Sequence, residues 1–262
     1  MARYINLYGY FLLQRFKILM EYRMNFLIGV VSMLFVQGAG ILAIWVVMRQ
    51  IPDLNGWRYD EILLIYGILM LSRSISHMLA DNLWTVGRHY IRTGGFDRFL
   101  VRPIDPLFHL LADRFCHDGI GTLLVGLALV VKASFGLGLV WTVGMLAYTT
   151  VMVISGGLIF IALMLMTATT SFWIMDSIPV TRVVHEMYEF AKYPLTIYHG
   201  GISFLLTWIF PFALASFYPA SFLLGRDVGW LAWFPPLMAA VLLSGAYAIW
   251  RFGLRHYSGT GS

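Results

Sequence analysis

The chain has 262 residues, of which 60% are hydrophobic and 12% charged, with 18 Lys and Arg against 13 Asp and Glu. A soluble domain carries about 25% charged residues, so this composition argues against a water-soluble globular fold. Stretches without any Asp, Glu, Lys or Arg cover 24–48, 133–175 and 193–225. Each exceeds the roughly 20 apolar residues that cross a bilayer. The composition therefore predicts a polytopic helical membrane protein.

Six spans follow in chain order from the apolar runs. Residues 4–22 repeat apolar side chains at steps of three and four beside a polar face, which is typical of an amphipathic helix on the membrane surface. The spans are expected at about 24–48, 61–86, 115–133, 139–168, 196–211 and 230–252. The run 133–175 could hold one span or two, because a single helix of that length would be twice the bilayer thickness.

The distribution of basic residues decides between these two topologies. Cytoplasmic loops carry an excess of Lys and Arg. With one span in 133–175, both termini and most of the basic residues face the cytoplasm. We therefore predict an all-α integral membrane protein with six transmembrane helices. Its expected location is the bacterial cytoplasmic (inner) membrane.

The run 193–225 is too long for one straight crossing. Pro211 should kink or end a helix, because proline lacks the N–H and clashes with the preceding turn. We expect 211–225, which includes Tyr218 and Pro219, to dip back into the outer leaflet after the fifth span. Such a re-entrant backbone must be covered by protein or line a cavity.

The stretch 94–104 lies between the second and third spans and has strong turn signals. Asp97 is expected to cap a short helix that Pro103 ends, and Asp105 to cap the next helix, with Pro106 at its first position. The stretch is either an ordinary loop or a docking element. As a docking element it would insert Phe96, Phe99 and Leu100 into a partner's groove, inside a charged rim of Asp97, Arg98 and Arg102.

A second amphipathic stretch runs from Pro179 to Tyr193, with apolar residues on one side and charged residues on the other. We interpret it as a cytoplasmic helix with a solvated face, and contact with a partner is the alternative.

Arg73, His77 and Asp81 are successive fourth residues of the second span and share one stripe. A charge near the bilayer centre costs at least about 2.5–3.5 kcal/mol, so this stripe should face protein or water. Three roles are open: pairing among themselves or with Asp118, lining a substrate path, or relaying protons.

The lone cysteine, Cys116, excludes an intrachain disulfide, and no multi-cysteine metal pattern is present. We expect no metal ion, cofactor or catalytic site on this chain. The phosphate-loop pattern GxxxxGK[ST] is also absent, so ATP hydrolysis would need another polypeptide. The basic residues lie between apolar runs, where membrane orientation explains them, and we expect no nucleic-acid partner.

Three stretches and the tail resemble one family. They are Gly95-Phe-Asp-Arg-Phe-Leu-Val-Arg-Pro-Ile-Asp-Pro-Leu-Phe108, Lys192-Tyr-Pro-Leu-Thr-Ile-Tyr198, Pro211 through Gly225, and the Tyr-Ser-Gly-Thr-Gly tail. In this order and spacing they resemble the membrane subunits of ABC-2-type exporters, in particular the six-span kind paired with a separate ATPase. The likeness touches most of the chain.

This resemblance implies the ABC-2-type exporter fold, in which 94–104 is the coupling helix that docks into the ATPase and 4–22 is an interfacial helix. It also implies two copies of a separate ABC ATPase subunit that bind ATP and Mg²⁺, a second permease copy or a similar permease, and contact with membrane lipids. The cargo would be hydrophobic or amphipathic: a drug, lipid, peptide or lipid-linked glycan. The competing classes are a membrane-embedded lipid-modifying enzyme and a proton-coupled carrier.

Overall fold

The computed structural model describes residues 7, 9–11, 13, 14, 17, 21, 23–51, 54–174 and 176–257. Every regular element within these ranges is helical, which confirms the predicted all-α fold. The predicted surface helix 4–22 falls largely outside the described residues, and those of its residues that are described are helical. The Tyr-Ser-Gly-Thr-Gly tail lies outside them beyond its tyrosine.

Within the described residues, five helical stretches are long and apolar enough to cross a membrane. They are Phe26–Gln50, Tyr59–Ile91, Asp118–Leu137, Val143–Ile174 and Pro235–His256. A sixth candidate is a pair of short stretches, Gly200–Ile209 and Phe212–Leu223, bent by 73° from one another. The chain is a multi-pass membrane protein, as its composition predicts.

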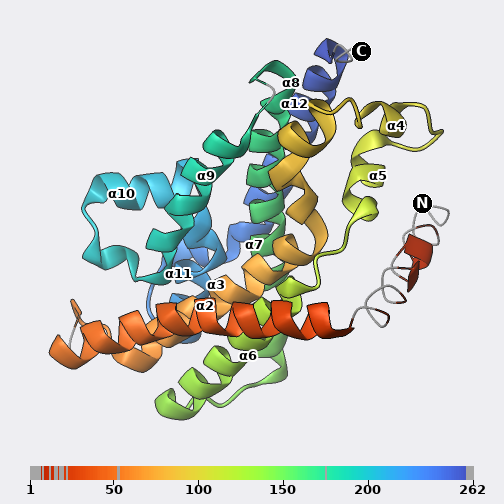
Figure 1. The fold of residues 1–262 in the computed structure, drawn as a ribbon. Helices are drawn as coiled ribbons and strands as arrows, with labels where there is room; N and C mark the ends of the chain where they lie inside the picture. Colours follow the sequence, from red (N-terminus) through yellow and green to blue (C-terminus); the bar gives the residue numbers. More distant parts are fainter. Residues whose placement is uncertain are drawn as a thin grey trace.

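The long helices form one bundle around a central helix (Figure 1). They are α2 (Arg23–Gln50), α3 (Tyr59–Ala80), α6 (Asp118–Leu137), α7 (Val143–Thr169) and α12 (Pro235–His256). Side chains of α3 between Ile62 and Met70 are fully buried, because α3 is apolar around its whole circumference and neighbours surround it. Helices α6 and α7 pack on α3, α12 packs on α7, and α2 lies across α6 with most of its surface exposed.

Glycines set the close approach of the helices that pack on α3. A Cβ added at Gly67 of α3 would lie 3.0 Å from the backbone nitrogen of Val130 on α6. On the other side of α3, a Cβ at Gly156 of α7 would lie 2.5 Å from Ser72 Oγ. Small residues at such crossings bring backbones into contact, which is the usual basis of helix association in membranes.

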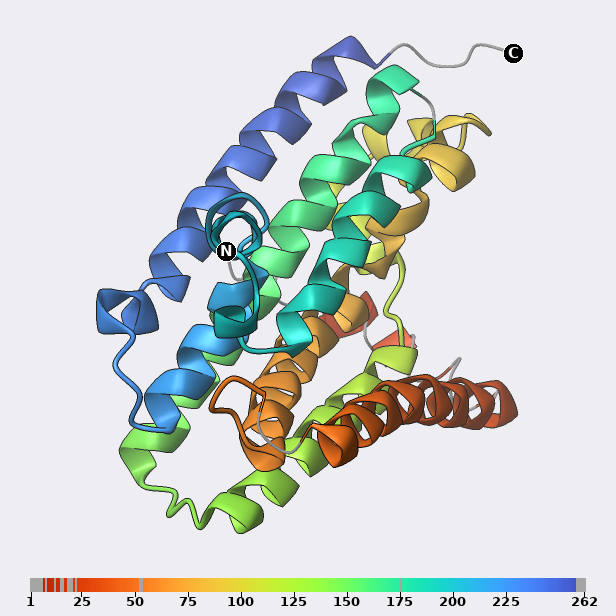
Figure 2. The same ribbon diagram turned by 90° about the vertical axis from the view of Figure 1, so that its left-hand side faces the viewer.

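One end of the bundle, which we call the α4 end, gathers three segments that are far apart in sequence. It holds α4 (Asp97–Leu100), α8 (Ser171–Ile174) and the last turn of α12 (Figures 1 and 2). Two polar contacts tie this end together, one of them from Arg88 of the neighbouring segment 86–91. Arg88 Nη2 lies 3.0 Å from Asp176 Oδ2, and Tyr257 Oη donates to Asp97 Oδ1 over 2.9 Å. Helix α3 reaches this end through a 3₁₀ turn, η1 (Asp81–Thr85), and a π turn, η2 (Val86–Ile91).

The opposite end, which we call the Trp57 end, holds the connections before α3, after α6 and before α12. Arg226 Nη2 lies 3.0 Å from Glu61 Oε1 and also bonds the carbonyl of Gly56. Trp57 Nε1 donates to Thr196 Oγ1 over 2.7 Å. The chain therefore turns alternately at two well-separated ends, as a membrane-spanning bundle requires.

The segment from α9 (Ile178–Met187) through η3 (Tyr188–Lys192) to η4 (Leu195–Ile197) runs the length of the bundle (Figure 2). It begins near the α4 end, where Thr181 Oγ1 donates to Thr167 Oγ1 over 3.1 Å, and reaches Trp57 at the other end. That 179–193 is a cytoplasmic element stays a prediction. Its inner face, with Thr181 and Tyr188, is buried against other helices.

Pro211 lies between α10 (Gly200–Phe204) with η5 (Leu205–Ile209) on one side and η6 (Phe212–Ala215) with α11 (Phe217–Leu223) on the other. The 73° bend confirms the predicted break at Pro211. All four side chains of η6 are buried, and Ser216 Oγ donates to the Ala191 carbonyl over 3.0 Å. This irregular backbone is thus covered by protein. The predicted span 196–211 and re-entrant stretch 211–225 become, in the structure, this bent pair.

Candidate functional site

Helix α4 is anchored by Phe96 and Phe99, which are both 0% exposed. The ring of Phe96 lies 5.4 Å from Phe172 of α8, 6.0 Å from Trp250 of α12 and 5.1 Å from Tyr257. The expectation that these two phenylalanines enter a partner's groove is corrected, because their own bundle already buries them. Phe96 fastens α4 to the ends of α8 and α12, whereas the ring of Phe99 packs on Tyr90 and His109.

The exposed face of α4 consists of different residues from the anchor. Val101 is 81% exposed and Leu100 42% exposed, and Arg98, Arg102 and Pro103 lie beside them at the surface. The sequence reasoning did not single out Val101, because alternation of apolar and charged residues cannot tell which apolar side chains the chain itself buries. The exposed face of α4 is therefore an apolar pair, Leu100 and Val101, within basic residues.

Asp97 has a different role from the predicted cap. It is the first residue of α4, after Phe96 at the cap position, and accepts the Tyr257 hydroxyl. Burial, followed by this carboxylate, raises the pKa of Tyr257 to about 12. The predicted cap at Asp105 is confirmed, since its Oδ1 accepts the Phe108 N–H over 3.0 Å at the start of α5 (Pro106–Asp113).

Helix α5 contacts α4 and the residues that follow it through two pairs of polar side chains. Arg98 Nη2 lies 2.8 Å from Asp113 Oδ2, and Arg102 Nη1 lies 3.2 Å from His109 Nε2. His109 is buried against the Phe99 ring, with centroids 4.8 Å apart. Burial, then the Arg102 guanidinium, lowers the pKa of His109 below its ordinary value of 6.5. The α4 surface is therefore a braced element and not a free loop.

The stripe Arg73, His77 and Asp81 pairs mostly with other elements rather than along itself. Arg73 donates a hydrogen bond to Tyr188 Oη and lies 3.3 Å from His185 Nε2 of α9. His77 Nδ1 lies 3.4 Å from Thr122 Oγ1 of α6, and its Nε2 is 4.0 Å from Asp81 Oδ1. The expected pairing within the stripe is thus limited to this wide His77–Asp81 contact. Asp118 lies beside His117, 3.3 Å away.

All three residues of the stripe line a cavity of about 260 Å³, together with Trp84, Phe160 and His185. Sequence reasoning missed the partners Tyr188 and His185, because they lie on α9 and η3, more than 100 residues later. The charged residues over 179–193 could have indicated these partners. A helix with that many polar groups needs polar partners when it packs inside a membrane bundle.

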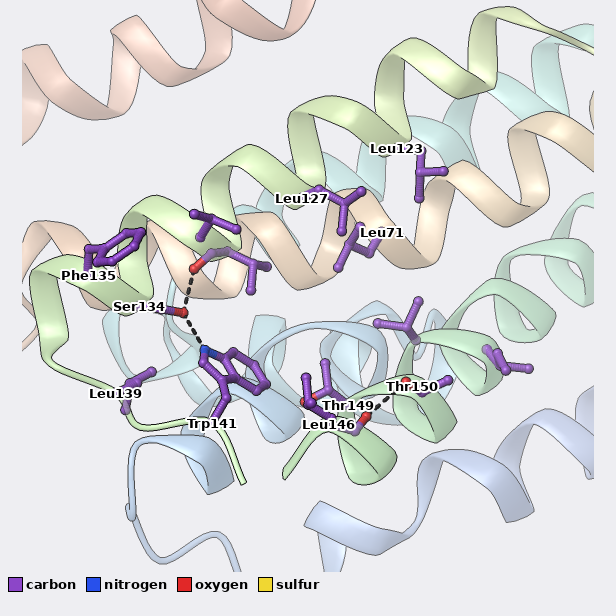
Figure 3. Close-up of a pocket in the computed structure, with 14 residues that line it drawn as sticks. Leu71, Leu123, Leu127, Ser134, Phe135, Leu139, Trp141, Leu146, Thr149 and Thr150 are labelled. Carbon is purple, nitrogen blue, oxygen red and sulfur yellow. Dashed lines mark hydrogen bonds between the residues drawn. The ribbon is translucent and has the colours of Figure 1, made fainter. Parts of the chain in front are cut away.

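A larger cavity of about 570 Å³ opens between α6, α7 and α3 (Figure 3). Its wall is apolar. Leu71, Leu127 and Ile154 are typical lining residues, and the polar groups that reach the wall bond to their own helices. Ser134 Oγ donates to the Val130 carbonyl over 2.6 Å while it accepts Trp141 Nε1 over 2.8 Å. Such a wall suits apolar chains and offers few partners to polar groups.

The bent pair around Pro211 places the residues predicted for it as follows. Pro211 stands at the break, Pro219 is buried in α11, and Tyr218 Oη lies 3.2 Å from Thr207 Oγ1 of η5. This contact ties the two arms of the bend to each other.

Comparison with known proteins bears on this arrangement. The sequence model of a family described as "ABC-2 family transporter protein" matches residues 34–261. No curated protein and no solved structure matches the chain. The family match covers all the long helices except the first part of α2, and it includes α4, the stripe of Arg73, His77 and Asp81, and the bent pair at Pro211. The chain belongs to the ABC-2 transporter family and is a membrane component of an ABC transporter.

Proposed function

We propose that this chain is the permease subunit of an ATP-driven exporter, which couples through the α4 surface to two copies of a separate ABC ATPase subunit. The absence of a phosphate loop in the sequence requires that ATP and Mg²⁺ act on that partner. The observation that carries the proposal is that an exposed apolar and basic surface, at Leu100 to Pro103, is rigidly fixed to the transmembrane bundle.

Because α4 is anchored in the bundle, a force on its exposed face can be transmitted to the transmembrane helices. A push on Val101 passes through the buried rings of Phe96 and Phe99 to Phe172 and Trp250, which lie at the ends of α8 and α12. Nucleotide-driven closure of the ATPases would thus move α7 and α12 relative to the rest. Only contacts that differ between two states of the bundle can drive such a change.

The proposed topology places the α4 end in the cytoplasm of a bacterial cell, with both termini on that side, and the bend at Pro211 near the outer face. The fifth crossing is then Ile178–Ile197, which runs between the two ends alongside α3 and α7. The bent pair Gly200–Ile209 and Phe212–Leu223 is the re-entrant segment. Together with the five long stretches this makes six crossings, and an even number keeps both termini on one side.

The cargo proposed is hydrophobic or amphipathic: a drug, lipid, peptide or lipid-linked glycan. The apolar cavity of Figure 3 supports this class, since its wall keeps its hydroxyl groups internally bonded. One set of six helices has little room to surround a large cargo. We therefore propose that the pathway forms between this chain and a second copy or a similar permease, within membrane lipid.

The test uses two valines that are equally exposed at opposite ends. Val101 and Val140 are each 81% exposed, and Val140 lies in the connection between α6 and α7 at the Trp57 end. The permease is co-expressed and co-purified with a candidate phosphate-loop ATPase, and vanadate-sensitive ATPase activity is measured. Val101→Glu should lower the yield of the complex by about tenfold or more, equal to about 1.4 kcal/mol, whereas Val140→Glu should not change it.

Equal yields and equal ATPase activity in the two variants would show that the α4 surface is not the docking site. Transport that persists without any ATPase, driven by a proton gradient, would support a proton-coupled carrier instead.

A further inference from the structure

We propose that His77, Asp81 and Cys116 bind a divalent transition-metal ion, with Zn²⁺ as the ion that their chemistry suits. One ligand atom from each, an imidazole nitrogen, a carboxylate oxygen and the thiol sulfur, lies within 4.8 Å of the other two. The ligands come from the end of α3, the start of η1 and the connection that leads into α6. This departs from the expectation that the chain binds no metal.

The backbone holds the three ligands in place before any ion binds. His77 lies in the last turn of α3 and Asp81 is the C-cap of that helix, so their side chains meet at the same helix end. Cys116 is held against the turn between them, because its N–H donates to the Met78 carbonyl over 3.1 Å. The sulfur thus approaches the two α3 ligands through a fixed backbone contact.

The separations suit an ion better than a direct bond. His77 Nε2 and Asp81 Oδ1 are 4.0 Å apart, which is too long for a hydrogen bond. Zn–N and Zn–O bonds of about 2.0–2.2 Å in a tetrahedral site separate such atoms by about 3.4 Å. Closing the His77–Asp81 pair to that separation takes an approach of about 0.6 Å, shared between the two side chains.

The orientation of the imidazole also matches that of a metal ligand. Nδ1 of His77 lies 3.4 Å from Thr122 Oγ1, and the tautomer that donates this hydrogen bond leaves Nε2 as an acceptor. Nε2 is the ring nitrogen that lies 4.0 Å from Asp81 Oδ1. Ligating histidines generally use their second nitrogen in this way, and the outer partner fixes the ring.

The cavity of about 260 Å³ provides both an entry path and the open position. It is lined by His77 and Asp81, so water there can complete a tetrahedral set of three protein ligands. Arg73 and His185 line the same cavity and oppose a cation, but Arg73 donates to Tyr188 and stacks over its ring. His117 and Asp118 lie next to Cys116 in sequence and pair with one another.

The ligand set selects the kind of ion. Nitrogen, oxygen and sulfur together favour Zn²⁺ over Mg²⁺ or Ca²⁺, which prefer oxygen alone. Cys116 would bind the ion as a thiolate, so formation of the metal–sulfur bond releases the thiol proton to solvent. Metal affinity should therefore rise with pH.

The full chain is purified in neutral detergent, treated with chelator and titrated with Co²⁺ as a spectroscopic substitute for Zn²⁺. Because Cys116 is the only cysteine, a thiolate-to-cobalt charge-transfer band can arise from no other residue. We expect this band to saturate at about one equivalent and to disappear when Zn²⁺ is added. Bound Zn²⁺, measured by elemental analysis, should match it.

Cys116→Ser should abolish the band, and Asp81→Asn should weaken Co²⁺ binding by at least about tenfold. Thr122→Val should weaken it by about tenfold through the second nitrogen of His77. His199→Gln, an exposed histidine elsewhere, is the matched control and should bind as the wild type does. Absence of the band in the folded wild-type protein, or a band unchanged in Asp81→Asn and His77→Gln, would overturn the proposal.

Discussion

The guanidinium of Arg73 on α3 donates a hydrogen bond to the hydroxyl of Tyr188 on η3, and its Cζ lies 4.3 Å from the centre of that ring. Tyr188 is only 3% exposed. A cation inside the bundle is thus held by an aromatic face and a hydroxyl, with His185 beside it, rather than by a carboxylate. This contact fastens the segment Ile178–Ile197 to the central helix.

Tyr188→Phe should destabilise the bundle, because it keeps the ring under Arg73 but removes the oxygen that accepts its hydrogen bond. The unpaired donor should cost about 1–3 kcal/mol, read as a lower unfolding temperature in detergent. Tyr198→Phe is the matched control, since the Tyr198 hydroxyl bonds the Phe190 carbonyl at an exposed position. A loss in Tyr188→Phe no greater than in the control would contradict this role of Tyr188.

Phe96→Ala should weaken the attachment of α4 to the bundle while leaving the exposed residues of the proposed docking surface unchanged. Loss of a fully buried phenylalanine costs about 3–5 kcal/mol, so α4 should loosen from α8 and α12. We expect faster proteolysis at Arg98 and Arg102 and poorer coupling to the ATPase, although Phe96 contacts no partner. Leu100→Ala, at an exposed position, should change stability by less than about 0.5 kcal/mol. Equal protection of α4 in both variants would refute the anchor.

His109 should make the stability of the α4 end depend on pH. Its pKa is lower in the folded chain than the ordinary 6.5, so the unfolded chain binds the proton first as pH falls. Its contribution to stability is complete above about pH 6.5 and declines below it, until the folded pKa is reached. Unfolding temperatures between about pH 5 and 8 should fall on acidification in the wild type.

His109→Gln should flatten that decline, whereas His199→Gln should retain it, because His199 is exposed and far from α4. A steeper or unchanged decline in His109→Gln would show that another group is responsible.

The sequence predicts the long helices well where charge marks their ends. The span expected at 24–48 is α2, Arg23–Gln50, since Arg23 and Arg49 bound a charge-free run. The break at Pro211 and the cap at Asp105 were likewise predictable, because both follow from local backbone chemistry. Helix α6 ends at Leu137, where Gly138 takes the left-handed conformation, and this is four residues past the expected end.

Other features depend on contacts that no local pattern contains. The charges of Ile178–Ile197 indicated a solvated helix, yet Arg73, far away in sequence, provides the partner that allows it into the bundle. The apolar residues of 94–104 were recognised, but the rings of Trp250 and Tyr257 decide that Phe96 points inward. The proximity of Cys116 to His77 could not be predicted from the sequence for the same reason.

The central claim is that the α4 end faces the cytoplasm, where an ATPase can reach it. Single cysteines at Val101 and Val140 report the two ends directly, in a chain whose own Cys116 is buried. With a membrane-impermeant maleimide applied to intact cells, Val140→Cys should be labelled and Val101→Cys should react only after the cells are opened. Labelling of Val101→Cys in intact cells, with Val140→Cys protected, would contradict the account.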